Sequence, residues 1–227
     1  MNTSMQKGFF LAPLVFVLML KVSIVHAQTE PPETPVLPAT QAYLDGDFLT
    51  AHSLWQPLAL AGDADAQTNL GILFRHGLGV VQDQSAALHW FQQAAGQSYP
   101  RGKFQLGQLY DYGLGVQQNH TEALRWYRAS ADQGYVRAQF ILGAMYGEGR
   151  GVPRSASEAA RWYRLAAEQG DANAQNILGR MLMDADGVER DDADALKWFV
   201  AAALQGHADA QENLRRVCET QVSDDCP

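Results

Sequence analysis

A period of 36 residues organises most of this 227-residue chain. Four blocks follow one another at this spacing without insertions, and eight positions of the block are identical in all four copies. Such self-similarity indicates a tandem array, whose units must stack on one another to bury their apolar faces. In the first block the identical positions are Leu70, Gly71, Gly79, Val80, Ala87, Trp90, Ala95 and Gln97.

Each block predicts two helices. In the first block, apolar residues at helical spacing predict a first helix from about Asp63 to His76 and a second from about Gln84 to Ala95. Gly77 should end the first helix, because glycine readily adopts the left-handed geometry of a helix C-terminus. Gly71 should let helix backbones approach closely, and we expect the recurring tryptophan, Trp90 in this block, to fill the space between neighbouring hairpins.

The ends of the array depart from the pattern. Upstream of the first block lies a degenerate opening unit, in which Trp55 is one place off the tryptophan register and Pro57 should kink or shorten the helix. Downstream, Arg215 replaces the repeated glycine in a polar final helix, as a capping element requires. In the fourth block Ala185 replaces the first turn glycine, so we expect a different turn there.

The block resembles the Sel-1-like repeat, a longer relative of the tetratricopeptide repeat. The third block shows the pattern well, from Ala138-Gln139 through Gly151-Val152 and from Ala159 to Gln169-Gly170, and the resemblance covers about residues 39–217. It implies an all-α, right-handed α-solenoid of antiparallel helix pairs, with four full repeats between the degenerate unit and the capping helix. It also implies a non-enzymatic scaffold that mediates protein–protein interactions.

The first 27 residues predict a secretory signal peptide. Lys7 precedes an apolar run from Phe9 to Leu20, and Val25-His26-Ala27 forms a cleavage site with small outer residues. An uncleaved membrane anchor is the alternative, although the run is short for a bilayer span. A proline-rich linker or tether follows over residues 28–38. We therefore expect a periplasmic or secreted protein whose only membrane contact would be an uncleaved signal.

Composition and motifs argue against several function classes. Seventeen Lys and Arg residues against 25 Asp and Glu give a net charge of −8, which disfavours nucleic-acid binding. Some secreted members of the resembled family act on β-lactams and carry cysteines in every repeat. This chain has no cysteine in its repeats, and after residue 27 it has no Ser-x-x-Lys or Gly-x-Ser-x-Gly motif. We therefore expect no catalytic residue and no cofactor. A periplasmic cell-wall or β-lactam-acting enzyme remains the alternative to a scaffold.

The histidines and the acidic residues offer no predicted metal site. The histidines show no metal-ligand spacing, so no metal is expected. The acidic stretch from Asp184 to Asp194 lacks the ligand pattern of a calcium loop, and Asp191 or Asp192 should instead cap the next helix. The only cysteines, Cys218 and Cys226, predict a disulfide that closes a C-terminal tail over residues 218–227.

One stripe of the first helices changes from repeat to repeat, beside a stripe that stays apolar. Residues four apart share a helix face, and positions that face a groove are free to diverge. In the resembled family the first helices line the concave side, where exposed aromatic residues would serve as interface anchors. Alternatively, the two phenylalanines of the stripe pack between helices. The candidate partner-binding residues are Ile72, His76, Phe104, Gln108, Tyr112, Phe140 and Ala144.

Overall fold

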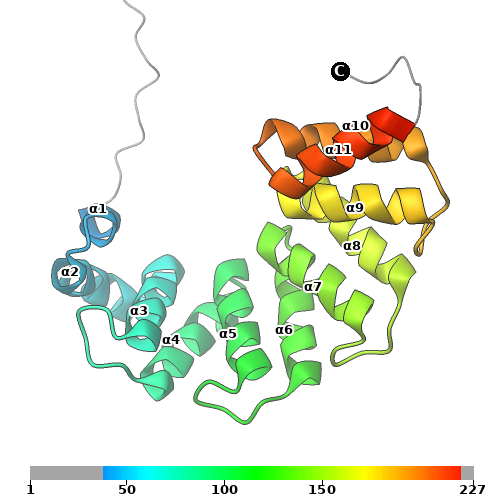
Figure 1. Ribbon diagram of the computed structural model, residues 1–227. Helices are drawn as coiled ribbons and strands as arrows, with labels where there is room; N and C mark the ends of the chain where they lie inside the picture. The colour runs from blue at the N-terminus through cyan, green and yellow to red at the C-terminus, as the bar shows by residue number, and fades with distance from the viewer. Residues whose placement is uncertain (1–37, 221–227) are drawn as a thin grey trace, which may run out of the picture. The chain divides into compact units, whose positions relative to one another are not determined.

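The computed structural model describes residues 38–220, which form eleven α-helices and no strand (Figure 1). From α3 onward each repeat supplies a first and a second helix. The second helix packs along the first helix of its own repeat and against the first helix of the next, so the chain forms an α-solenoid of antiparallel helix pairs. The helices are α1 (Pro38–Leu44), α2 (Phe48–Leu60), α3 (Ala64–His76), α4 (Gln84–Gly96), α5 (Pro100–Tyr112), α6 (His120–Ala131), α7 (Val136–Glu148), α8 (Ala156–Glu168), α9 (Ala172–Asp184), α10 (Asp192–Leu204) and α11 (Ala208–Thr220).

The helix ends follow from capping residues in the sequence. Asp63 caps α3 by accepting a hydrogen bond from the Ala66 backbone N–H. Of the two caps that the sequence offered for α10, it is Asp191 that accepts a hydrogen bond, from the Asp194 backbone N–H. Gly77 ends α3 in the left-handed conformation. Ala185 ends α9 with nearly the same angles, φ 54° and ψ 35°, so the expectation of a different turn in the fourth repeat is wrong. The alanine instead holds a conformation that glycine would adopt with less strain.

An aromatic ring packed on a glycine forms the centre of every repeat. A Cβ atom added to Gly107 would lie 2.8 Å from the Tyr127 ring, and one added to Gly179 would lie 2.7 Å from the Phe199 ring. Any larger residue at the glycine would therefore displace the ring. Trp55 occupies the same register one period before Phe91 and is also buried. The column of core rings comprises Trp55, Phe91, Tyr127, Tyr163 and Phe199.

The repeated tryptophans lie one residue before these rings, so the ring that packs on the glycine is not the tryptophan. Trp162 is buried, but Trp90, Trp126 and Trp198 are only half-buried. Trp90 packs against the core cluster that the opening unit shares with α3. Arg125 stacks over Trp126 with its guanidinium carbon 4.4 Å from the ring centroid. The half-buried tryptophans therefore cover one side of the contact between neighbouring units.

The two ends of the described array are built differently. Helix α2 contains Pro57 and continues to Leu60, so the proline does not cut the helix short. Helix α11 continues to Thr220, beyond the expected boundary at residue 217, and exposes Glu212, Arg215 and Arg216. No helix within residues 38–220 is long and apolar enough to span a bilayer. The signal peptide, most of the linker and Cys226 lie outside the described residues, so the predicted cleavage and the predicted disulfide stay predictions.

Candidate functional site

The structure divides the candidate stripe into packed and accessible residues. Phe104 is only 5% exposed, and its ring packs against Tyr127 and Tyr135 with centroids 5.5 and 5.2 Å apart. Phe140 is half-buried, 5.6 Å from the Tyr163 ring. For Phe104 the packing alternative therefore holds, and this residue cannot act as an exposed anchor. Phe140 offers a partner only the part of its ring that is not covered.

The remaining candidates lie nearer the C-terminal ends of the first helices. Ile72, Gln108 and Ala144 are half-buried, whereas His76 and Tyr112 are exposed, Tyr112 to 58%. Residues four apart share a helix face, so each pair points the same way from its helix. We call this surface the first-helix face; it consists of Ile72, His76, Gln108, Tyr112, Ala144, Glu148, Arg180 and Asp184.

Arg75 orders the first part of this face. Its Nη1 donates to the Oε1 atoms of Gln105 and Gln108, at 3.0 and 2.7 Å, and so connects the end of α3 to α5. Burial lowers the pKa of Arg75 from its ordinary value, but a guanidinium remains charged at neutral pH. Burial, followed by the nearby Arg75 charge, also lowers the pKa of His76. The face therefore carries a neutral histidine at pH 7.

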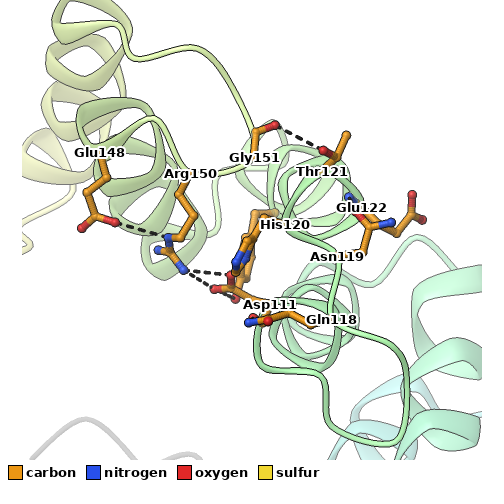
Figure 2. A network of polar contacts seen from close by, with 10 residues as sticks. Asp111, Gln118, Asn119, His120, Thr121, Glu122, Glu148, Arg150 and Gly151 are labelled. Carbon is orange, nitrogen blue, oxygen red and sulfur yellow. Dashed lines mark hydrogen bonds and ion pairs between the residues drawn. The ribbon is translucent and has the colours of Figure 1, made fainter.

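A buried carboxylate, Asp111, comes directly before the exposed Tyr112 in the chain. Asp111 is 1% exposed and is surrounded by donors from α6 and from the turn after α7 (Figure 2). Arg150 Nη1 donates to both carboxylate oxygens at 2.8 and 2.7 Å. His120 Nδ1 lies 2.8 Å from Oδ1, and the Tyr127 hydroxyl donates to Oδ2 at 3.3 Å. The four contacts are divided equally between the two oxygens.

The four contacts to the Asp111 carboxylate limit what this group can do chemically. A carboxylate offers about four acceptor sites, and here four donor contacts use them. Asp111 therefore has no acceptor site left for a general base or a metal ligand, and its role is to join repeats two and three. No group of three or more potential metal ligands occurs among residues 38–220. Sequence reasoning missed this site because Arg150 lies 39 positions further along the chain.

The turn that carries Arg150 is itself fixed in place. A Cβ atom at Gly151 would lie 2.5 Å from the His120 carbonyl oxygen, so only glycine allows this turn to rest on the start of α6. Glu148 Oε2 lies 3.3 Å from Arg150 Nε and extends the network to the first-helix face (Figure 2). The exposed Glu148 is thus connected to the buried Asp111 through Arg150.

Beyond α7 the same face opens into hollows. A hollow of about 260 Å³ lies between α7, α8 and α9, and one of about 410 Å³ lies between α9, α10 and α11. Arg180 lines both of them. Sequence reasoning did not select Arg180 as a candidate, although its charge replaces Ile72, Gln108 and Ala144 at one register. We call the larger space the C-terminal hollow; it is lined by Arg180, Met183, Asp184, Phe199, Asn213, Arg216 and Val217.

Comparisons with known proteins agree with this architecture. The chain matches the Sel1 repeat over four consecutive stretches, residues 64–99, 100–135, 136–171 and 172–207, which together cover more than half of its length. A search of curated proteins found no significant match.

Two solved structures are particularly similar. The chain is 32% identical to c5321, a protective antigen of uropathogenic Escherichia coli with this fold, at a TM-score of 0.76. It is 33% identical to a Sel1 repeat protein from Oxalobacter formigenes, at a TM-score of 0.72. The matches cover 82% and 75% of this chain but only 41% and 49% of those proteins, so the chain spans less than half of each. The protein belongs to the Sel1-repeat family.

Proposed function

We propose that this chain is an exported, non-enzymatic scaffold that binds a protein partner through the first-helix face. Sel1 repeats commonly mediate protein–protein interactions, which supports the general class. The observation that carries the proposal is Tyr112, a tyrosine exposed to 58% next in the chain to Asp111, whose hydrogen bonds join the second and third repeats. Rigid, exposed aromatic residues are typical anchors of protein interfaces.

The pattern of change along the repeats favours the same face. The core rings stay aromatic, and Leu70 and its three equivalents are identical. On the first-helix face, by contrast, His76 corresponds to Tyr112, Glu148 and Asp184 in the following repeats. A surface that varies while its support stays constant can present a different residue at each repeat, as recognition of one irregular partner requires.

Export is part of the proposal because of the N-terminal sequence. Lys7, the apolar run from Phe9 to Leu20 and the Ala27 site have the order of a signal peptide. N-terminal sequencing of the protein isolated from its native host should begin at Gln28. An intact Met1 would contradict cleavage.

A capture experiment tests the choice of surface. The tagged chain is incubated with periplasmic extract of the host, and bound proteins are compared between the unaltered chain and Tyr112→Ala. Leu204→Ala is the matched control, because Leu204 is 84% exposed at the end of α10, away from the first-helix face. We expect Tyr112→Ala to lose a bound protein that Leu204→Ala retains. Equal recovery with both variants would contradict the proposal.

A further inference from the structure

The C-terminal hollow has the chemistry of a site for a short peptide. At about 410 Å³ it falls within the range of small-ligand sites. Its apolar lining comes from Met183, Phe199 and Val217, on three different helices. Arg180 and Arg216 add two guanidinium groups, from α9 and α11. Such a hollow suits an apolar side chain that is followed closely by carboxylates.

The charges around the hollow favour an acidic ligand at its α9 wall. Arg180 is exposed, and no carboxylate within residues 38–220 lies at ion-pair distance from it. Among the residues 38–220 that line the hollow, Asp184 is the one acidic residue, against two arginines. By contrast, the neighbouring Arg215 does not line the hollow and is paired with Glu212 at 2.5 Å. The described lining therefore combines two arginine side chains with apolar ones.

A segment with this chemistry directly follows α11. Residues 221–225, outside the described part of the chain, read Gln-Val-Ser-Asp-Asp. We propose that the C-terminal hollow is a peptide-binding site and that residues 221–225 of this same chain are its ligand, with Val222 on the apolar wall and Asp224 and Asp225 near the two arginines.

Because residues 221–225 are covalently attached to α11, they should occupy the hollow in preference to a foreign peptide. Val217 lines the hollow and lies only five positions before Val222. Because each residue spans up to about 3.6 Å, these few residues are long enough to bring Val222 from α11 to the hollow. A short tether holds its ligand at an effective concentration in the millimolar range. A foreign peptide would therefore have to displace this segment before it could bind.

The test observes the arginine side chains in the full chain. Nitrogen-15 labelled arginine gives one Nε–H resonance per residue, and the spectra are compared between the unaltered chain and the variant Val222→Ser/Asp224→Asn/Asp225→Asn. Both cysteines stay in place. We expect the resonances of the hollow arginines, Arg180 or Arg216, to move, while that of Arg215 stays unchanged.

A second step adds an acetylated and amidated peptide with the sequence of residues 221–225. It should bind at least about tenfold more tightly to the triple variant than to the unaltered chain, because the tethered competitor is gone. Introducing Arg216→Gln into the triple variant should weaken that binding, whereas Arg215→Gln should not.

Three results would overturn the proposal. The hollow arginines could keep their resonances in the triple variant. The added peptide could bind the Arg216→Gln and Arg215→Gln forms equally well. Finally, the shift could grow with protein concentration, which would show that the segment binds a second copy of the chain. None of these measurements needs the partner proposed for the first-helix face, so the two proposals fail independently.

Discussion

The second and fourth repeats have the same helix-pair fold but carry different side chains near the ends of their first helices, α5 and α9. In the second repeat the position after Tyr110 is Asp111, whose buried carboxylate binds Arg150 and His120. In the fourth repeat the equivalent position is Met183, which lines the open C-terminal hollow. The same register therefore carries an ionic network in the second repeat and lines a hollow in the fourth.

The core ring should give the largest effect, because it is common to both repeats. Tyr127→Ala removes a buried ring that contacts Gly107 and Phe104, and also the hydroxyl that donates to Asp111. We expect the free energy of unfolding to fall by about 3–5 kcal/mol in a urea titration. Trp126→Ala, at a half-buried position, is the control and should cost clearly less. Equal losses of unfolding free energy in the two variants would show that Trp126 packs in the core as fully as Tyr127.

The ionic network should give the next largest effect. Asp111→Asn keeps the shape of the side chain but removes the charge that Arg150 and His120 contact, so we expect a loss of about 1.5–3 kcal/mol in unfolding free energy. Asp65→Asn is the matched control. Its pair with Arg101 is partly exposed and should contribute about 1 kcal/mol or less. A cost no greater than that of the control would show that Asp111 does not join the two repeats.

The turn of the fourth repeat offers a stabilising change. Ala185 has φ 54°, so Ala185→Gly should relieve left-handed strain and raise the unfolding free energy by about 1 kcal/mol. Gly149→Ala changes the equivalent turn of the third repeat in the opposite sense and should destabilise the protein by a similar amount. Thermal melting of both variants checks the pair, and a lower midpoint for Ala185→Gly would contradict this reading.

The smallest change in stability is expected at Tyr112. Because its side chain is 58% exposed, Tyr112→Ala should alter the unfolding free energy by less than about 0.5 kcal/mol. A circular-dichroism melt on the capture samples provides the measurement. A large destabilisation would mean that Tyr112 supports the fold, and a loss of captured protein could then not be assigned to its surface.

The sequence predicted the helices better than the packing between them. The period, the turn glycines and Asp191 placed the helix ends to within about one residue, because capping and helix termination are local. Identity in every repeat points to Trp90, but the core ring is the next residue. The core register requires only an aromatic ring and therefore holds phenylalanine, as in Phe91, or tyrosine, as in Tyr127.

The candidate site shows a similar division. Helical spacing correctly grouped Gln108 with Tyr112 on an accessible surface, but it could not show that Phe104, on the same stripe, is covered by Tyr135. Tyr135 is the N-cap residue of α7, so this contact joins the first helix of one repeat to the start of the next repeat's first helix. Asp111 and Arg150 depend in the same way on packing between repeats, which the pattern within one repeat does not contain.

Two glycine substitutions test most directly whether the second repeat is closed and the fourth is open. A Cβ atom at Gly107 or Gly179 meets its ring at nearly the same distance, 2.8 and 2.7 Å. Tyr127 is held by Asp111 and Phe104, whereas Phe199 borders the C-terminal hollow and can shift into it. In urea titrations Gly107→Ala should cost about 1–3 kcal/mol, and Gly179→Ala should cost distinctly less. Equal losses, or a larger loss for Gly179→Ala, would contradict the distinction between a closed and an open repeat.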